Sequence, residues 1–457
     1  METTYKILAS ILAFRINPLV RDHGLESQCG SLNSKGCPDA LFALKTALQT
    51  RREHNLATHV LFVDLVKAFD SVNHDFMLEV LRKFGIPEVT IDVIRRMYKD
   101  FELTFSVGKA TENIPYTIGV HQGDNLAPLL FNLFFQAALE SLEPVWDEKS
   151  IPLPEFRWFP TSKNGRINGR LRQQGPASGT SFSFGKSLYV DDGAFLFDSR
   201  QDLSAGANLI FSHFKRFGLT MHIGKDGSKS KTEAVIFAAP GKTYEEYDTT
   251  PVNVDEGYIT YTTQFKYLGS ILSWNLDDRP DLENRALQVR KAFQAMLPKV
   301  FRNSSISLKV KRMLYMAIPL NLLLWGCESW ALKDSDWKFL QVFHTSSICQ
   351  ILNVNMVEVQ TQRITNKQVY SRFTIDSIKS IVVSRQLRWI GKIAMMEESR
   401  LPKKFLNAWH PNPWPMGRPL TTIRHTYLHA LRYIGENLEN DEQGKLNDCP
   451  PHHPARS

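Results

Sequence analysis

Two adjacent carboxylates are the residues best suited to chemistry in this chain. Asp191 and Asp192 separate two short apolar segments, 187–190 and 194–197. These segments predict strands and Asp192-Gly193 is typical of a turn, so we expect a hairpin with both carboxylates at its tip. Like charges side by side repel unless a cation lies between them, and hard oxygen ligands suit Mg²⁺. A solvated surface turn is the alternative for such a pair taken alone.

A third carboxylate, Asp64, closes a short apolar run that predicts a strand. It can reach Asp191 and Asp192 only if the two predicted strands lie side by side in one sheet. Three converging carboxylates could hold two divalent ions, Mg²⁺ with Mn²⁺ as the alternative. Two such ions about 3.5–4 Å apart clamp the attacking and leaving oxygens of a phosphoryl transfer. Asp70 and Asp75 are competing carboxylates, although Asp75 also suits the start of a helix.

Between these carboxylates lies a segment, 119–132, that suits contact with a flat ligand. Its two glycines allow the backbone to approach closely. Gln122, beside Gly123, offers an amide that can both donate and accept hydrogen bonds. The segment lacks the P-loop pattern, and an ordinary loop before a helix is the alternative.

A sheet and covering helices must position these residues, and the periodicity of the chain indicates both. Strands and helices mix up to residue 275, and helical spacing follows, which predicts an α+β catalytic unit before an all-α unit. The predicted strands cover 59–64, 103–107, 116–120, 187–190, 194–197, 234–238 and a pair within 258–271. The predicted helices cover the segment from Tyr5, 39–53 with Asp39 as N-cap, 75–84, 89–99, the segment from Pro128, and 203–217.

The whole chain has a net charge of +8, and its positive charge is concentrated toward the C-terminal end. Residues 276–457 carry 26 Lys and Arg against 16 Asp and Glu, and residues 356–432 carry 13 against 4. Trp389, Trp409 and Trp414 interleave with these charges. Charge combined with stacking surface suits RNA or single strands. Solvated helix faces around core tryptophans are the alternative.

Neither a disulfide framework nor a membrane span is indicated. The five cysteines include no CxxC pair. The most apolar run, 313–327, contains Pro319 and is shorter than the roughly 20 residues of a membrane span, so it predicts a buried helix. Glu2 and Arg15 disrupt any signal-peptide pattern. These features favour an intracellular protein, in cytoplasm or nucleus, that is not secreted and has no membrane partner.

Four blocks of the sequence, taken in order, resemble the reverse transcriptases of LINE-type, non-LTR retrotransposons. The blocks are residues 64–70, 119–132, 189–192 and 265–269, and the resemblance covers most of residues 5–350. It implies an RNA-directed DNA polymerase that performs two-metal nucleotidyl transfer. The implied partners are an RNA template, a DNA primer and deoxynucleoside triphosphates, and the oligomeric state stays open.

The resemblance also implies a right-hand polymerase of α+β class, whose palm is an antiparallel sheet with packed helices. The implied divisions are partial fingers over 1–56, a palm over 57–275 with a basic loop at 150–186, a helical thumb over 276–355, and a basic C-terminal region over 356–457.

Particular residues acquire roles from this resemblance. Asp64, Asp191 and Asp192 match the family's metal-binding triad, with the Leu65 carbonyl as a further ligand. Phe69 matches the aromatic residue that abuts the sugar 2′ position and rejects ribonucleotides.

The remaining matches concern the nucleotide and the primer. Gln122 and Gly123 match the contact to the incoming nucleotide, and Lys231 matches the catalytic lysine near the pyrophosphate leaving group. The residues that match the primer grip are Phe265, Tyr267, Leu268 and Gly269.

Three departures separate the chain from the family pattern. Ala127 stands where Ser is common, the loop 150–186 is long, and family members carry a further fingers block before the point where this chain opens. The resemblance therefore implies a fragment lacking the start of the fingers and the endonuclease, with weak affinity for nucleotide. The alternative function is a catalytically impaired, nucleic-acid-binding relic. A group II intron maturase is disfavoured, because no maturase-like segment is present.

Overall fold

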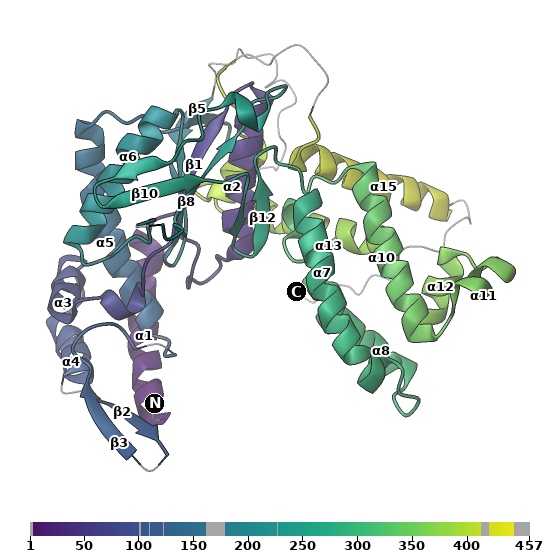
Figure 1. Ribbon diagram of the computed structural model, residues 1–457, viewed down its shortest axis with the longest axis horizontal. Coiled ribbons are helices and arrows are strands. Elements are labelled where there is room, and N and C mark those ends of the chain that lie inside the picture. Colours follow the sequence, from purple (N-terminus) through teal and green to yellow (C-terminus); the bar gives the residue numbers. More distant parts are fainter. Residues whose placement is uncertain are drawn as a thin grey trace. The chain divides into compact units, whose positions relative to one another are not determined.

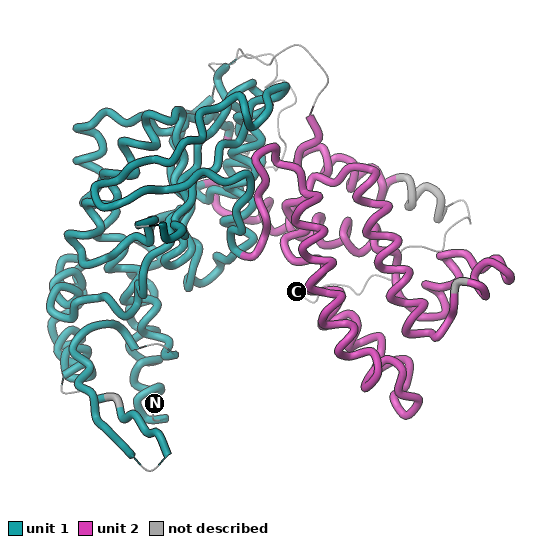
Figure 2. Tube along the Cα trace, viewed as in Figure 1, with its two compact units in different colours: residues 1–159, 169–268, 399–415 teal, residues 160–168, 269–398, 416–457 magenta. Residues whose placement is uncertain are grey.

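The chain forms two compact units (Figure 2). A computed structural model describes residues 3–99, 102–108, 110–121, 123–160, 179–225, 227–412 and 420–442. Unit 1 comprises residues 1–159, 169–268 and 399–415, and unit 2 comprises residues 160–168, 269–398 and 416–457. Among the described residues, unit 1 mixes strands with helices and unit 2 is helical apart from β12 (Ser270–Ser273). The predicted α+β class, with helices following, is confirmed.

The core of unit 1 is a six-stranded mixed sheet with strand order β6-β7-β1-β8-β10-β9. Its strands are β1 (Thr58–Val63), β6 (Lys186–Tyr189), β7 (Asp192–Phe197), β8 (Glu233–Phe237), β9 (Val252–Val254) and β10 (Gly257–Tyr261). β1 runs antiparallel to both β7 and β8, whereas β10 runs parallel to β8, so the prediction of a wholly antiparallel sheet is wrong. Every residue of β1 is buried, since this strand is central and covered on both faces.

Helices cover the sheet on the face that holds the larger core (Figure 1). Leu61 and Val63 of β1 join a hydrophobic cluster with α5 and α6, whereas the side chain between them, Phe62, lies on the opposite face and stacks on Phe265. The helices of unit 1 are α1 (Thr3–His23), α2 (Cys37–Glu53), α3 (His74–Lys83), α4 (Glu88–Tyr98), α5 (Ala127–Glu148), α6 (Arg200–Arg216) and α14 (Leu401–Asn407).

Two sequence predictions within unit 1 are wrong. The partner of β2 (Glu102–Val107) is β3 (Ala110–Pro115), and residues 116–120 form no strand. The predicted basic loop contains an antiparallel pair, β4 (Glu155–Trp158) and β5 (Thr180–Ser183). Residues 161–178 of that loop lie outside the described part of the chain.

The region predicted as one C-terminal piece, 356–457, is divided between the units. Residues 399–415, here called the return segment, belong to unit 1, where α14 packs on α2. Phe405 anchors the return segment, because its fully buried ring contacts Phe156, Phe182 and Phe184.

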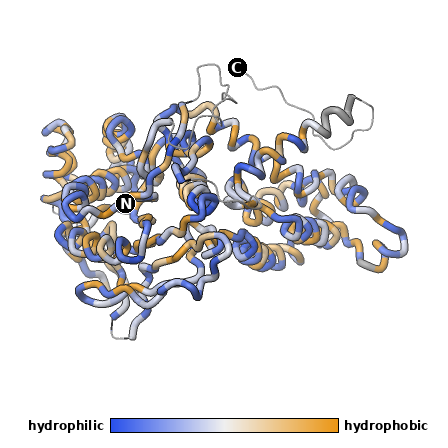
Figure 3. The backbone as a smooth tube through the Cα atoms, turned by 90° about the horizontal axis from the view of Figure 1, so that it is seen from above, coloured by the Kyte–Doolittle hydropathy of each residue, from blue (hydrophilic) through white to orange (hydrophobic). Residues whose placement is uncertain are grey.

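Unit 2 is built from helices that alternate hydrophobic and hydrophilic residues (Figure 3). Its helices include α7 (Arg279–Met296), α8 (Leu308–Tyr315), α9 (Asn321–Leu323), α10 (Asp334–Leu352), α11 (Met356–Thr361), α12 (Asn366–Phe373), α13 (Ile378–Ala394) and α15 (Ile423–Glu442). Apolar side chains of α7 to α10, α12 and α13 contribute to a second core cluster, which includes Leu340 and Val382. Among the described residues, no helix is long and apolar enough to cross a membrane.

Candidate active site

The register of two central strands brings distant carboxylates to the same end of the sheet. β1 and β7 pair antiparallel, and the last paired positions are Val63 and Gly193. One further step along this register lines up Asp64 with Asp192. Directly opposite residues in an antiparallel pair have Cα atoms roughly 4.5–5.5 Å apart and point to the same face.

Asp191 reaches this end of the sheet through a tight hairpin. Tyr189 of β6 pairs with Asp192 of β7, so the two loop residues are Val190 and Asp191. The predicted turn at Asp192-Gly193 is therefore wrong by two positions, because Asp192 already belongs to the strand. Val190 has a φ of 58°, a left-handed conformation that hairpin turns require and β-branched residues rarely adopt.

The three carboxylates interact electrostatically. Desolvation, followed by the charges of Asp191 and Asp64, raises the pKa of Asp192 to about 6, although its side chain remains accessible to solvent. Desolvation and the charge of Asp64 also raise the pKa of Asp191. Such mutual repulsion is what a bound divalent cation would relieve, and carboxylate oxygens are the donors that Mg²⁺ prefers.

The carboxylates do not form a closed metal cage as they stand. Across the described residues, no group of three or more His, Cys, Asp or Glu side chains is gathered tightly enough to hold a metal ion. The donor types and the repulsion therefore fit a divalent cation, and the side chains would have to draw together around it.

The backbone of Asp64 is fixed from two sides. Its N–H donates to Thr232 Oγ1 at 3.1 Å, and the same hydroxyl lies 3.3 Å from the Asp64 carbonyl. The His222 N–H also donates to that carbonyl, at 2.8 Å. Thr232 is fully buried. Sequence reasoning missed Thr232 and His222, since their contacts span more than 150 positions and follow no local pattern.

The Leu65 carbonyl, predicted as a further metal ligand, has an orientation compatible with that role. Leu65 forms an antiparallel bridge with Met221. The hydrogen bonds of this bridge are made by the neighbouring Asp64 carbonyl and Val66 N–H, and not by Leu65 itself. Among the described residues, no hydrogen bond to the Leu65 carbonyl is found.

Lys231 lies on the other side of β1 from the hairpin. The register of β1 with β8 ends at Phe62 and Glu233, and two steps further would bring Lys231 level with Asp64. The Lys231 side chain is exposed, and its backbone N–H donates to His222 Nδ1 at 3.2 Å. Lys231 therefore lies just before β8, at the same end of the sheet as the carboxylates.

Phe69 lies shortly after β1, in a 3₁₀ turn over Phe69–Ser71. Its half-buried ring stacks on Phe131 of α5, with centroids 4.6 Å apart. The Val120 N–H donates to the Phe69 carbonyl at 2.8 Å, which ties this turn to the glycine-containing segment. Gly119 has a φ of 95°, and a Cβ there would lie 2.9 Å from the Asp70 Cα, so the close approach requires glycine.

The predicted nucleotide contact is described only in part. Gln122 lies outside the described residues. Gly123 is exposed, has a φ of 95°, and faces open space where a Cβ would stand. The next residue, Asp124, accepts hydrogen bonds from the N–H groups of Leu126 and Ala127 at 2.8 and 2.6 Å, which secures the start of α5.

The predicted primer-grip residues surround a turn that follows β11 (Gln264–Tyr267). Phe265 stacks on Phe62 with centroids 4.2 Å apart, and the buried Tyr267 donates its hydroxyl to the Ser187 carbonyl at 3.1 Å. Leu268 and Gly269 have φ values of 47° and 81°. The chain passes from unit 1 to unit 2 between these two residues.

Of the three tryptophans predicted to form a stacking surface, Trp389 is buried and Trp409 is half-buried. Trp389 is only 6% exposed within unit 2. Trp409 packs against Phe159 and pairs its backbone with Arg157. Trp414 lies outside the described residues. Trp389 therefore serves packing, whereas a stacking role for Trp409 stays a prediction.

Residues 1–272 match a family described as "Reverse transcriptase (RNA-dependent DNA polymerase)". The Pol polyprotein of the Drosophila melanogaster type-2 retrotransposable element R2DM is 31% identical over 136 residues, which is 30% of this chain and 13% of that protein. The probable RNA-directed DNA polymerase from transposon BS of the same organism is 22% identical over 404 residues, covering 80% of this chain and 39% of that protein.

The chain thus spans less than half the length of the curated relatives it matches. Among solved structures, telomerase from Candida tropicalis, in complex with a fragment of telomeric RNA, is similar with a TM-score of 0.39 and 12% identity. That similarity covers 88% of this chain and 56% of the telomerase chain.

Proposed function

The chain belongs to the reverse transcriptase family, with relatives among retrotransposon polymerases, and we propose that unit 1 extends a DNA primer on an RNA template. The observation that carries this proposal is the register of β1 and β7, which aligns Asp64 with Asp192. Asp64, Asp191 and Asp192, with the Leu65 carbonyl, are the proposed ligands of two Mg²⁺ ions, with Mn²⁺ as the alternative.

The chain's own residues hold this site in place. Two divalent ions, when bound, stabilise charge on the attacking and leaving oxygens of an in-line nucleotidyl transfer. Thr232 and the His222 amide fix the Asp64 backbone, so that its carboxylate is aimed before substrate binds. Such pre-positioning reduces the reorganisation that the reaction would otherwise require.

Neighbouring residues are proposed to select and orient the deoxynucleoside triphosphate. Phe69, supported from behind by Phe131, restricts space beside the sugar 2′ position. Gln122 and Gly123 contact the incoming nucleotide, and the open space at Gly123 supports that role. The exposed Lys231 offsets negative charge as pyrophosphate leaves.

This proposal keeps the divisions that the resemblance implies. They are partial fingers over 1–56, a palm over 57–275, a helical thumb over 276–355 and a basic C-terminal region over 356–457. Phe265, Tyr267, Leu268 and Gly269 are the primer grip.

A second candidate is a nucleic-acid-binding relic that no longer polymerises. The observation in its favour is that the three carboxylates, within the described structure, are not gathered into one metal-holding group.

Primer extension on an RNA template with Mg²⁺ separates the two candidates. We expect the parent chain to extend the primer, and Asp192→Asn to lower the rate by about 100-fold or more, since a charged ligand is lost. Asp75→Asn is the matched control, because Asp75 is an exposed aspartate in the first turn of α3. No extension by the parent, with RNA binding intact, would favour the relic. Equal rates in parent and Asp192→Asn would contradict the metal assignment.

A further inference from the structure

A loop from the N-terminal part of the chain lies along the hairpin that carries Asp191. Gln28 forms a parallel bridge with Leu188 of β6. The Cys29 N–H donates to the Leu188 carbonyl at 2.9 Å, and the Leu188 N–H donates to the Ser27 carbonyl at 2.9 Å. Residues 27–29 therefore extend the edge of the sheet just beside the turn formed by Val190 and Asp191.

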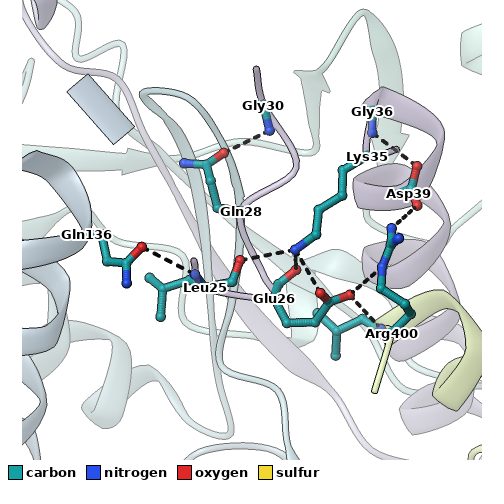
Figure 4. Close-up of polar contacts among 10 residues, drawn as sticks. Leu25, Glu26, Gln28, Gly30, Lys35, Gly36, Asp39, Gln136 and Arg400 are labelled. Atoms are coloured by element: carbon teal, nitrogen blue, oxygen red, sulfur yellow. Dashed lines mark hydrogen bonds and ion pairs between the residues drawn. The ribbon is translucent and has the colours of Figure 1, made fainter. Parts of the chain in front are cut away.

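The side chain of Gln28 clamps the turn itself. Its Oε1 accepts from the N–H of Val190 at 2.8 Å, and its Nε2 donates to the carbonyl of Val190 at 3.1 Å. The same Oε1 accepts from the Gly30 N–H at 2.9 Å, as Figure 4 shows. Gln28 is only 6% exposed, so these bonds are shielded from water. One amide thus satisfies both backbone groups of the residue that precedes Asp191.

Val190 needs such support because its conformation is unfavourable. A φ of 58° is strained for a β-branched residue and persists only where the surroundings enforce it. Asp191 follows directly, so any relaxation of Val190 would swing the Asp191 carboxylate away from Asp64.

The loop that carries Gln28 packs closely against the hairpin turn. A Cβ at Gly30 would lie 2.4 Å from the Val190 nitrogen, so only glycine allows the loop to approach this closely. Asn132 of α5 donates to the Gly30 carbonyl at 2.9 Å, which ties the loop to the helix behind it.

We propose that Gln28 is a positioning residue for catalysis, which holds Val190 in its left-handed conformation and thereby aims the Asp191 carboxylate. Gln28 itself touches neither substrate nor metal in this role. The inference rests on the proposed polymerase function for its kinetic consequence, but its conformational consequence is independent of activity.

The kinetic test is primer extension by Gln28→Ala. We expect kcat to fall about 10- to 100-fold with the nucleotide KM nearly unchanged, because a misplaced catalytic group slows chemistry more than binding. Gln386→Ala is the matched control, since Gln386 is a fully buried glutamine of unit 2 whose amide donates to the Cys327 carbonyl. A kcat loss no larger than that of the control would overturn the proposal.

Val190→Gly should rescue the kcat that Gln28→Ala loses, which a merely structural role of Gln28 does not predict. Glycine adopts a positive φ without strain, so the turn should no longer depend on the clamp. We therefore expect Gln28→Ala to cost less than about 3-fold in kcat when Val190→Gly is already present, a coupling that a double-mutant cycle measures. Equal losses in both backgrounds would contradict the proposed role.

Hydrogen exchange of residues 188–192 tests the clamp without any activity. Gln28→Ala should exchange faster there than the parent and the Gln386→Ala control, since the Val190 N–H loses its acceptor. If Gln28→Ala does not fold, Gln28→Glu serves instead. It keeps an acceptor oxygen but sets a second oxygen against the Val190 carbonyl, so a smaller acceleration is expected. Unchanged exchange in Gln28→Ala would overturn the proposal even if the chain polymerises. Faster exchange in a chain that does not polymerise would contradict only the proposed polymerase function.

Discussion

At the level of single residues, the site is defined by three carboxylates that lie close enough to repel one another. Asp192 follows Asp191 and lines up with Asp64 one step beyond the last paired positions of β1 and β7, and desolvation together with these neighbours raises its pKa to about 6. A carboxyl whose pKa is higher in the folded than in the unfolded chain gives stability only while it is protonated. That stability is fully present below about pH 4 and is lost as the pH rises through about 6. Crowding therefore costs stability at neutral pH, and cation binding would offset that cost.

Asp192→Asn should consequently stabilise the metal-free fold at neutral pH and have little effect at pH 4. The amide cannot ionise, so repulsion with Asp191 and Asp64 is removed. Urea unfolding in a chelator at pH 4 and pH 7.5 measures this difference. Adding Mg²⁺ at pH 7.5 should stabilise the parent more than the variant. A variant that is less stable than the parent in chelator at pH 7.5 would show that the carboxylates do not repel.

At the level of elements, apolar runs were sufficient to predict the strands that carry the carboxylates, but not their exact ends. The runs ending at Asp64 and flanking Asp191 predicted β1, β6 and β7, and their pairing was the condition for a site. The turn was misplaced, because the left-handed Val190 is held by Gln28, 162 positions away in sequence. Local turn propensities do not contain such a contact.

The run at 313–327 illustrates the same limit. It predicted a buried helix, yet Met313, Met316 and Ile318 are 59%, 46% and 41% exposed. The segment passes through a π-helix over Met316–Leu320, which contains Pro319. Pro319 lacks the N–H that regular helical bonding needs, and hydrophobicity alone does not reveal which side chains will find a partner.

The return segment is the element that sequence reasoning misjudged most. Arg400 makes an ion pair with Glu26 at 2.9 Å and with Asp39 at 2.7 Å (Figure 4). Asp39, predicted as an N-cap, is instead the third residue of α2 and accepts from the Gly36 N–H at 3.1 Å. The partners of Arg400 thus flank the loop that carries Gln28, so the return segment supports that loop from the far end of the chain.

Arg400→Ala should destabilise unit 1, because it removes a cation that pairs with Asp39, which is only 1% exposed. A loss of about 3 kcal/mol is expected for breaking such a buried pair. Urea unfolding followed by a probe in unit 1 measures it. The control is Arg82→Ala, which breaks exposed pairs with Glu79 and Glu88 and should change little. Similar losses in the two variants would mean that Arg400 is not a structural tie.

At the level of the whole molecule, the excess positive charge and the candidate catalytic carboxylates lie in different parts of the chain. Residues 276–457 carry the excess of positive charge, whereas the carboxylates lie in the nearly neutral part before them. Composition predicted this separation, and the periodicity of apolar residues predicted the change from mixed strands and helices to helices alone. It could not predict that residues 399–415 rejoin unit 1, since that depends on Phe405 and Arg400 finding partners far away in sequence.

The central claim is that Asp64 and the Asp191–Asp192 pair bind divalent ions together, and iron-directed cleavage tests it most directly. Fe²⁺ bound in place of Mg²⁺ reduces added hydrogen peroxide to hydroxide and a hydroxyl radical, which cuts the backbone near the bound ion. We expect cuts around both residue 64 and residues 190–192, suppressed by excess Mg²⁺, retained in Asp75→Asn and absent in a double Asp191→Asn, Asp192→Asn variant. Cleavage at only one of the two segments, or cleavage that survives the double substitution, would contradict a shared metal site.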